Sequence, residues 1–449
     1  MTTAEPENSP WGTANRIPPI GLAFVAANLE KHGYKVDLLD NYLINKNAEE
    51  LKNYIKTLNP EIVGVSCSSN TYKRAVETAK AVKEALPNCK LVTGGPHPSV
   101  MPESMLQHPE VDYVVMGEGE RAMVELAEHI TSGKKDADLA KIPGIAYKSN
   151  GKVVRNPPKF IEDMDEIPYP ARHLLPMDRY SREAPFLSNK PVDVMNVMRG
   201  CPFNCNWCNV KEIWGAKSRS FSPKRVADEM EHINSTYGTR GVYFVGDNFT
   251  LNKKRAIEIC NEIKSRNLDI VWACDTGVDL VSREVLKAMK SAGCQTIWFG
   301  VESGAPKILK IINRGITVEQ AERAFKLCKE EKIETGISLM LGIPGETRED
   351  METTFKFARK LDPDWHQFNV FIAYPGCKLY KQILENGWYD RIEDFLAYVK
   401  TDEFDYDSLM EVQKQYHVNF NKSPKRILGK IRKEGLWKVL QKGVHYARS

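Results

Sequence analysis

Three cysteines lie close together in one segment of the chain: Cys201, Cys205 and Cys208. Their spacing, C-x3-C-x2-C, allows three thiolates to hold one face of a cubane iron–sulfur cluster. A structural zinc site normally has four ligands in paired C-x2-C units, and no further Cys or His stands within ten residues of this group. Three ligands leave one iron with an open coordination position. The segment therefore predicts a 4Fe–4S centre that takes part in a reaction, in preference to a structural zinc site.

The cysteines follow the first of six predicted strands in the second half of the chain. Hydrophobic periodicity predicts these strands at residues 192–198, 241–245, 270–274, 296–300, 335–341 and 365–371. Amphipathic helices are predicted between them, for example at residues 223–237, 253–266, 283–292, 318–331 and 348–360. Six consecutive βα units indicate a partial or complete parallel barrel, in which reactive groups lie at the carboxyl ends of the strands.

The first part of the chain also alternates helix and strand. Strands are predicted at residues 36–40, 62–66, 90–93 and 113–116, and helices at residues 21–32, 48–58, 72–86, 103–107 and 120–132. This order indicates a doubly wound, flavodoxin-like parallel sheet, whose ligands bind beyond the carboxyl ends of the strands.

Small, polar and glycine-rich turns follow three successive strands of this sheet. They are 66–70 with Ser68 and Asn70, 94–97 reading Gly-Gly-Pro-His, and 117–120 reading Gly-Glu-Gly-Glu. Each turn alone is consistent with an ordinary βα connection. Three such turns after successive strands favour a binding face, because glycine allows a ligand to approach the backbone closely.

A proline-rich stretch separates the two α/β regions. Residues 143–190 contain seven prolines and a Ser-Asn-Gly-Lys hairpin turn at 149–152, which indicates an irregular linker. The predicted fold class is α/β: a doubly wound domain at 1–142, the linker at 143–190, a partial (β/α)6 barrel at 191–390, and a small helical region at 391–449.

The last segment of the chain is basic. Residues 422–449 contain nine Lys or Arg against one Glu, with apolar residues interleaved. If this segment forms a basic amphipathic helix, that helix can lie on a membrane surface or cover a groove. It can also be the solvated face of a C-terminal domain that caps the barrel, and the glycines at 429, 435 and 443 favour this second interpretation.

The overall composition is that of an ordinary globular protein. The chain has 449 residues, of which 42% are hydrophobic and 27% charged, and its 63 Lys and Arg nearly balance its 59 Asp and Glu. The chain has no large excess of positive charge, so its net charge gives no indication of nucleic-acid binding. No stretch reaches the ~20 apolar residues of a membrane span, and the first ten residues lack an apolar signal core. A cytoplasmic protein with reduced thiols is expected.

At these motifs the sequence resembles the radical SAM superfamily, and within it the branch with a cobalamin-binding domain before the barrel. The resemblance rests on the cysteine triad and on the doubly wound domain upstream, and it covers nearly the whole chain. It implies three cofactors: a 4Fe–4S cluster, S-adenosylmethionine (SAM) and cobalamin. It also implies that Cys201, Cys205 and Cys208 are the catalytic cluster ligands.

The resemblance further implies contacts to SAM at the cluster segment and at the ends of barrel strands. These are Phe203, Trp207, Gly246, Asp247, Asn248, Glu302, Ser303, Gly342 and Pro344. Glu302 is also compatible with a simple salt bridge, but its place at a strand end favours a function. The chain departs from the family at the third strand, where residues 275–278 lack the usual arginine, and at Cys377, where threonine is usual. An isolated Cys377 is interpreted as a small buried side chain.

The contacts implied for cobalamin lie in the three turns of the first domain. These are Ser68, Asn70, Gly94, Gly95, Pro96, His97, Gly117, Glu118, Gly119 and Glu120. The D-x-H-x-x-G motif, whose histidine ligates cobalt in other cobalamin enzymes, is absent. His97 is compatible with an axial ligand, but packing or hydrogen bonding is favoured, so cobalt is expected to be five-coordinate or water-ligated.

The function implied by the resemblance is methylation of an unactivated carbon through a 5′-deoxyadenosyl radical and methylcobalamin. One alternative is an oxidative cyclase or C–C bond-forming enzyme, since the chain also resembles anaerobic magnesium-protoporphyrin ester cyclases. Another is a non-catalytic cobalamin carrier, although a carrier has no use for an open cluster. A methylthiotransferase is disfavoured, because its N-terminal domain needs its own cysteine triad. The implied partners are a small-molecule or lipid substrate and a reductant such as flavodoxin or ferredoxin.

The family also implies a hydrophobic first strand before residue 17, in the middle of the doubly wound sheet. Residues 1–15 are polar and contain two prolines, so they are not expected to form it. A gap there would leave two rows of backbone groups without partners. We therefore expect a longer native reading frame that encodes this strand.

Overall fold

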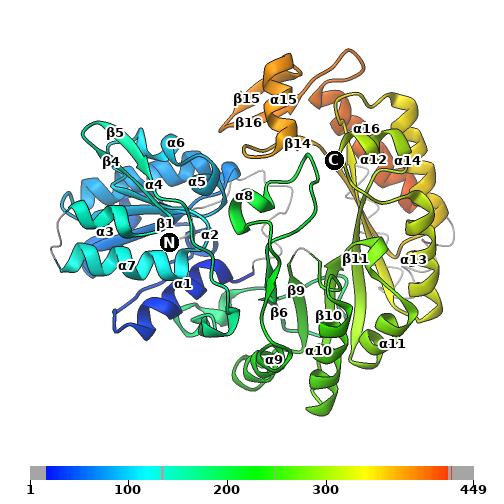
Figure 1. Cartoon of the computed structure of the whole chain (residues 1–449), viewed down its shortest axis with the longest axis horizontal. Helices are drawn as coiled ribbons and strands as arrows, with labels where there is room; N and C mark the ends of the chain where they lie inside the picture. Colours follow the sequence, from blue (N-terminus) through cyan, green and yellow to red (C-terminus); the bar gives the residue numbers. More distant parts are fainter. Residues whose placement is uncertain (1–16, 133–135, 247, 423–425, 427–449) are drawn as a thin grey trace.

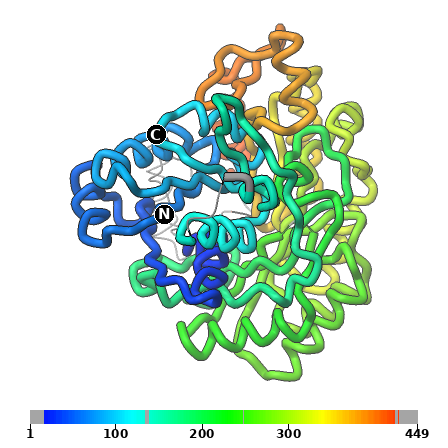
Figure 2. Tube along the Cα trace, turned by 60° about the vertical axis from the view of Figure 1, so that its left-hand side comes forward, coloured from blue at the N-terminus to red at the C-terminus, as the bar shows by residue number. Residues whose placement is uncertain are grey.

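A computed structural model of the chain describes residues 17–132, 136–246, 248–422 and 426. It contains two α/β units, one blue to cyan and one green to yellow in Figure 1. Figure 2 shows that the first unit lies directly against the barrel, with a C-terminal hairpin above both. The predicted α/β fold class is confirmed.

The first unit is a five-stranded sheet in the order β1-β2-β3-β4-β5. β1 (Ile62–Ser66), β2 (Lys90–Gly94) and β3 (Tyr113–Val115) run parallel, and β4 (Ile145–Ser149) and β5 (Lys152–Arg155) add an antiparallel hairpin. The hairpin turn predicted at 149–152 is confirmed. The first sheet thus extends beyond residue 142, into the segment predicted as linker.

Helices cover both faces of this sheet, as expected for a doubly wound domain (Figure 1). α1 (Ile20–Lys31) and α7 (Gly119–Thr131) pack together on one face, and α3 (Ala48–Leu58) and α4 (Tyr72–Ala85) on the other. The shorter helices are α2 (Asn41–Ile44), α5 (Pro96–Val100) and α6 (Pro102–Leu106).

The strand predicted at residues 36–40 is a wrong prediction. The chain there forms no strand, and β1 is the outermost strand of the sheet within the described residues. A strand needs a neighbour for its hydrogen-bonded ladder, and no described strand lies between 36–40 and β1. Residues 1–16, which include the segment 1–15 that is not expected to form the first strand, lie outside the described residues.

The second unit is a six-stranded parallel sheet that curves into a partial barrel, in the order β13-β12-β11-β10-β9-β6. All six predicted barrel strands are confirmed. They are β6 (Val192–Asn196), β9 (Gly241–Val245), β10 (Val271–Thr276), β11 (Cys294–Glu302), β12 (Glu334–Leu341) and β13 (Trp365–Val370). The helices outside the barrel are α9 (Pro223–Tyr237), α10 (Lys253–Ser265), α11 (Arg283–Ser291), α12 (Pro306–Ile311), α13 (Val318–Glu330) and α14 (Arg348–Leu361).

Helix caps and one apolar core fix this unit. Ser222, Thr317 and Thr347 each accept a hydrogen bond from the first turn of α9, α13 and α14. A single cluster of buried apolar side chains joins the strands to these helices. The segment between the units contains three short 3-10 helices, Met164–Glu166, Arg172–Leu174 and Met177–Arg179.

The region after the barrel is not purely helical, so that prediction is wrong in part. It contains α15 (Lys378–Asn386) and α16 (Tyr406–Asn421), but β14 (Ile372–Ala373), β15 (Tyr389–Glu393) and β16 (Leu396–Val399) form an antiparallel sheet. β16 is buried at three of its four positions, and this apolar strand pairs with both neighbours. Most of the basic segment, residues 423–425 and 427–449, lies outside the described residues.

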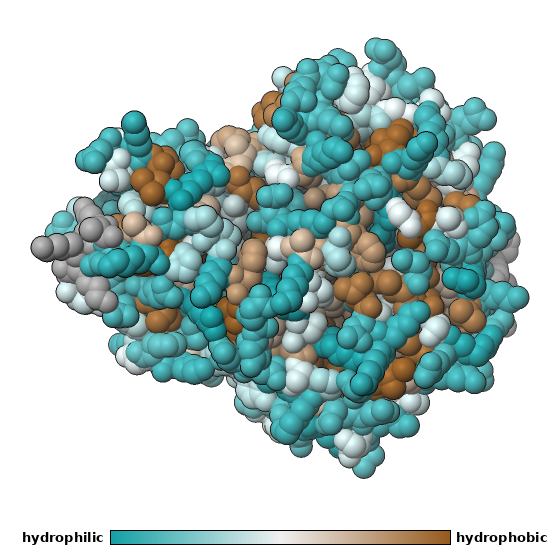
Figure 3. Space-filling view, in the orientation of Figure 1, coloured by the Kyte–Doolittle hydropathy of each residue, from teal (hydrophilic) through white to brown (hydrophobic). Residues whose placement is uncertain are grey.

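The surface in the view of Figure 3 is mainly hydrophilic, with apolar side chains in separate groups. In the part of the chain that the structure describes, no helix combines the length and the apolar character needed to cross a membrane.

Candidate functional site

The cysteine segment leaves the barrel just after its first strand. β7 (Met198–Arg199) and β8 (Arg219–Ser220) form a short antiparallel pair that closes the base of this segment, and α8 (Val210–Trp214) lies within it. Gly200 has a φ of 84°, a conformation that favours glycine. The base of the cluster segment is therefore a tight, hydrogen-bonded neck.

The three cysteines line one cavity of about 320 Å³. All three are half-buried, and none is joined in a disulfide bond. Within the described residues, no three His, Cys, Asp or Glu side chains converge on a position for a single metal ion. A cubane cluster needs no such convergence, because each iron takes its own thiolate. The arrangement therefore fits a 4Fe–4S cluster and does not fit a zinc ion.

Nearby N–H groups support negative charge on the sulfurs. The Asn248 side chain donates to Sγ of Cys201 at 3.8 Å, and the Val210 backbone N–H donates to Sγ of Cys208 at 3.5 Å. Burial raises the pKa of the Cys205 thiol, and the neighbouring Arg314 guanidinium partly offsets this rise. Such donors stabilise thiolates, the form that ligates iron.

The segment is also held from the far side of the barrel. The Asn206 backbone N–H donates to the Ile312 carbonyl at 2.9 Å, and its side chain donates to the Ile311 carbonyl at 2.8 Å. The Asn209 side chain donates to the Pro375 carbonyl at 3.1 Å. The carboxyl end of α12 and the end of β14 thus fix the loop that carries the thiols.

Glu302 is the most unusual residue at the strand ends. It is buried with a φ of 71°, at an irregularity in the pairing of β11 with β12. Burial raises its pKa to about 7, and Arg314 opposes this rise. Left-handed backbone at a non-glycine residue costs energy and is concentrated at functional sites. A surface salt bridge would need neither the burial nor the left-handed backbone of Glu302, so these features favour a functional role for this residue.

The other expected SAM contacts have mixed surroundings. Phe203 lines the cluster cavity, and the half-buried Trp207 packs against the barrel core. The Ser303 hydroxyl is within hydrogen-bonding distance of the Thr354 hydroxyl at 2.9 Å. Asn248 is buried beside Cys201 as described. Asp247 lies outside the described residues.

The glycine turn after β12 is held by its own glutamate. Oε2 of Glu346 accepts from the backbone N–H of Gly342 at 2.6 Å and of Ile343 at 3.1 Å. Burial raises the pKa of Glu346 to about 7. Pro344 is buried in this turn, and a Cβ at Gly246 would lie 3.0 Å from Cγ of Met198. Glu346 therefore fixes the buried turn after β12, while Gly246 allows close packing against Met198 after β9.

In the first unit, the three predicted turns meet at one edge of the sheet. The Cys67 N–H donates to the Gly94 carbonyl at 2.8 Å, and the Gly117 N–H donates to the Ser99 hydroxyl at 2.8 Å. The accessible or half-buried residues along this edge are Ser68, Asn70, Gly94, Gly95, Pro96, Gly117 and Gly119. Small, half-buried or exposed residues at the carboxyl ends of parallel strands are compatible with a ligand site, such as one for cobalamin.

His97 has no ring nitrogen available for a metal. It is 1% exposed, with Nδ1 at 2.9 Å from the Ser69 hydroxyl and Nε2 at 2.8 Å from the Ser104 hydroxyl. Burial lowers its pKa to about 4, so it is neutral at pH 7. These contacts favour the hydrogen-bonding role over the axial-ligand role.

We expect the His97→Ala variant to leave the EPR spectrum of bound cob(II)alamin unchanged, because both imidazole nitrogens are already used within the protein. The measurement is best repeated with cobinamide, which lacks the nucleotide base and its nitrogen. Superhyperfine splitting from one nitrogen in the wild type, absent from the variant, would contradict this assignment.

Glu118 and Glu120 do not face the open edge. They are buried between the two units, where Glu118 accepts from Arg199 and Arg219, and Glu120 accepts from Arg199. The sequence motif located these residues in the right loop, but their side chains point toward the cluster segment. Their expected role as cobalamin contacts is not supported by this placement.

The C-terminal hairpin contributes residues that sequence reasoning missed. Phe395 at its tip has a φ of 67° and packs on Tyr72 and His97, with ring centroids 5.0 and 5.2 Å apart. The Tyr374 hydroxyl donates to the Asn70 side chain at 3.2 Å. Cys377 is buried and its sulfur accepts from the Tyr380 N–H, as expected for a small structural side chain.

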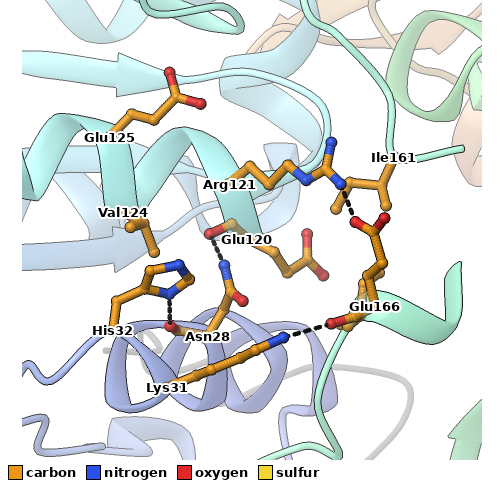
Figure 4. A pocket seen from close by; sticks show the side chains of 10 residues that line it. Asn28, Lys31, His32, Glu120, Arg121, Val124, Glu125, Ile161 and Glu166 are labelled. Carbon is orange, nitrogen blue, oxygen red and sulfur yellow. Dashed lines mark hydrogen bonds and ion pairs between the residues drawn. The ribbon is translucent and has the colours of Figure 1, made fainter. Parts of the chain in front are cut away.

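A separate cavity of about 280 Å³ lies between α1, α7 and the connecting segment (Figure 4). Lys31 donates to the Glu166 carbonyl at 3.0 Å, and Arg121 pairs with the Glu166 carboxylate. Arg121 and Glu166 thus form an ion pair within its lining, and the cavity shares no described lining residue with the cluster cavity.

Comparison with known proteins gives matches over both units. Residues 195–358 match the model of the Radical SAM superfamily, and residues 13–127 match the model of the B12 binding domain. The uncharacterized methyltransferase PH0819 of Pyrococcus horikoshii is 36% identical over 92% of this chain and 90% of its own length. The anaerobic magnesium-protoporphyrin IX monomethyl ester cyclase of Rubrivivax gelatinosus is 32% identical over 82% of this chain and 67% of its own length.

Two solved structures have the same fold. The cobalamin-dependent S-adenosylmethionine radical enzyme OxsB, with aqua-cobalamin and SAM bound, has a TM-score of 0.78 at 16% identity and covers 97% of this chain and 69% of its own. The radical SAM methyltransferase TsrM of Kitasatospora setae, with cobalamin and a 4Fe–4S cluster, has a TM-score of 0.68 at 22% identity and covers 83% of this chain and 72% of its own.

Proposed function

This chain belongs to the radical SAM superfamily, in the branch with an N-terminal B12-binding domain, and we propose that it is a cobalamin-dependent methyltransferase that acts on an unactivated carbon. One relative, 36% identical over 92% of this chain and 90% of its own length, is described as an uncharacterized methyltransferase. The chain is a radical SAM enzyme, and cluster, SAM and cobalamin are its cofactors. The methyl transfer itself and the nature of the carbon are our proposal.

The observation that carries this proposal is the contact between the turn after β3, which contains residues proposed to hold cobalamin, and the segment that contains the three cysteines. A Cβ at Gly117, in the cobalamin edge, would lie 3.3 Å from the carbonyl oxygen of Ile213, in the cluster segment. Glu118 in the same turn accepts from Arg219 at 2.7 Å. A carrier of methyl groups beside a radical-generating cluster is what carbon methylation requires, because both groups must reach one substrate.

The residues present suit three tasks. When bound, the cluster supplies an electron for SAM cleavage and cobalamin supplies a methyl carrier. Cys201, Cys205 and Cys208 would ligate the cluster, and Asn248 and Arg314 would stabilise the negative sulfurs. The half-buried turn at Gly94 and Gly95 would contact cobalamin, and His97 would supply no ligand to the cobalt. The close packing of both units would exclude water from the space between them.

We further propose a cytoplasmic location, a small-molecule or lipid substrate, and electron supply by flavodoxin or ferredoxin. Asn204 of the cluster segment is exposed and lines the cavity that holds the three cysteines. A small reductant is expected to approach there, because electron transfer needs a short path to the iron. Peripheral contact of the basic C-terminal segment with a membrane is the alternative to the favoured interpretation, in which this segment belongs to a domain that caps the barrel.

We expect the reconstituted enzyme to form S-adenosylhomocysteine and 5′-deoxyadenosine together when it is given SAM, a reductant and a small-molecule extract of its host. The first product reports methyl donation and the second reports radical formation. With trideuteromethyl-labelled SAM, a metabolite that carries the label should accumulate. The Cys208→Ala variant serves as the control and should form no 5′-deoxyadenosine.

An oxidative cyclase is the second candidate, because a cyclase relative is 32% identical over most of this chain. A cyclase would form 5′-deoxyadenosine without S-adenosylhomocysteine and without a labelled metabolite. That outcome in the same assay would reject the methyltransferase and favour the cyclase.

A further inference from the structure

Four charged side chains form an interdomain ion-pair network, defined here as Glu118, Glu120, Arg199 and Arg219. Arg199 donates to Oε1 of Glu118 at 3.2 Å and to Oε1 of Glu120 at 2.6 Å. Arg219 donates to the same Oε1 of Glu118 at 2.7 Å. The glutamates come from the turn after β3, and the arginines come from β7 and β8. The network therefore joins the proposed cobalamin edge to the cluster segment.

The network is completely buried and its groups are well paired. The four side chains are between 1% and 4% exposed. Oε2 of Glu118 accepts from the Ile161 N–H at 2.6 Å, and Arg219 also donates to the carbonyls of Ile161 and Trp214. Two positive and two negative charges balance. Buried pairs of this kind are weak evidence for stability, because removing charges from water is costly. Their value lies in allowing only one arrangement of the groups they join.

The arginines occupy a special place in the cluster segment. Arg199 and Arg219 are register partners in the β7–β8 pair, so they mark the two ends of the segment that holds the three cysteines. Both contact one carboxylate, that of Glu118. Any shift of the turn after β3 is therefore transmitted to both ends of the cluster segment at once.

The other side of the network is equally fixed. Glu120 stands at the beginning of α7, and its backbone carbonyl accepts from the side chain of Asn28 in α1 at 2.6 Å (Figure 4). The Arg199 guanidinium also stacks over Trp214 and Phe24, with distances of 4.9 and 5.4 Å to the ring centroids. The network thus joins the α1–α7 layer to the neck of the cluster segment.

We propose that the interdomain ion-pair network positions the cluster relative to cobalamin, so that the two cofactors hold one separation and orientation. This inference rests on the proposed function, which places the cofactors on either side of the network. The four residues are positioning residues, since none is required to touch a cofactor. Misplacement of about 1 Å can lower the rate of a reaction about 100-fold, so such a constraint has a large effect on coupling.

The test is the magnetic interaction between the reduced cluster and cob(II)alamin in the doubly loaded protein. The reduced cluster speeds the spin relaxation of nearby cob(II)alamin, and this effect depends steeply on distance. In Glu118→Gln, which keeps the shape and removes the charge shared by both arginines, we expect normal cluster and cobalamin contents. Because the relaxation enhancement reports the separation of the cluster and the cobalt, we expect it to change at least about twofold or to become heterogeneous. We also expect the ratio of 5′-deoxyadenosine to S-adenosylhomocysteine to rise.

The matched control is Glu229→Gln, which removes an equally buried carboxylate that pairs with Arg172 and Arg225 and, among the described residues, with none of the four in the network. It should lower the thermal midpoint to a similar degree and leave the relaxation unchanged. Arg199→Lys is the second variant: it keeps the charge but loses the planar fork that bridges two carboxylates, so the same change is expected. Because both variants report independently, poor folding of one leaves the other decisive.

The outcomes separate this inference from the proposed function. Wild-type protein that binds both cofactors without any magnetic interaction would contradict the proposed function. A wild-type interaction that stays unaltered in Glu118→Gln and Arg199→Lys would overturn the positioning role alone. An equal change in the Glu229→Gln control would also overturn it, because the effect would then be general destabilisation.

Discussion

Replacing any one of Cys201, Cys205 or Cys208 by alanine is expected to abolish the iron–sulfur absorption of the anaerobically reconstituted protein. The three thiols share one cavity, and its described lining contains no other Cys or His to replace a lost ligand. A cluster held by two thiolates dissociates readily, so iron content should fall to a small fraction of the wild-type value. The measurement is visible absorption together with iron and sulfide analysis.

The control for these variants is Cys328→Ala. Cys328 lies on α13, fully buried in the apolar core, and burial raises the pKa of its thiol. A neutral buried thiol is no iron ligand, so this variant should keep its full cluster at a cost of about 1 kcal/mol in stability. Stoichiometric zinc in place of iron in the wild-type protein would refute the cluster assignment.

The barrel could be predicted from the sequence because its signals are local. The bounds of α9 and β9 coincide with the predicted residues 223–237 and 241–245. Ser222 and Pro223 begin the helix as cap and first residue, and Gly238 ends it with a φ of 63°. The apolar run that follows has the length of a buried strand. Capping residues and local apolar runs of this kind can be identified in a single sequence.

The partners of the site residues were not predictable, because they come from distant parts of the chain. Glu118 meets Arg199 and Arg219 across 81 and 101 positions. Sequence spacing placed Glu118 in a ligand turn, but it could not show that the side chain points into a domain interface. Arg314 near Cys205 was missed for the same reason, since the loop after α12 has no motif.

Two fold predictions were wrong because strand formation depends on neighbours. Residues 36–40 have a strand-like pattern but form no strand, and no described strand lies between them and β1. The reverse holds for β15 and β16, which were predicted as part of a helical region. The pairing of Leu396–Val399 with both β14 and β15 stabilises that hairpin, and this tertiary context is absent from the local sequence.

The Gly200→Ala variant is expected to lose most of its cluster while the two units stay folded. Gly200 has a φ of 84°, and a Cβ there would lie 2.3 Å from the carbonyl oxygen of Lys217. Strained backbone and overpacking together cost about 2–6 kcal/mol. The carbonyl cannot move easily, because Arg199 and Arg219 pair across the neck and are both fixed by Glu118. The segment itself must therefore shift, and with it Cys201, the next residue.

A matched glycine variant separates this effect from the general penalty of left-handed backbone. Gly238 ends α9 with a φ of 63°, and a Cβ there would meet nothing within 4 Å. Gly238→Ala should therefore cost only about 1 kcal/mol and keep its full iron content. If Gly200→Ala binds iron as the Gly238→Ala control does, with the same visible absorption per chain, the neck between β7 and β8 does not determine the position of the thiols. Loss of iron in Gly200→Ala alone, with circular dichroism unchanged, would establish that the backbone at the base of the segment orients the cluster ligands.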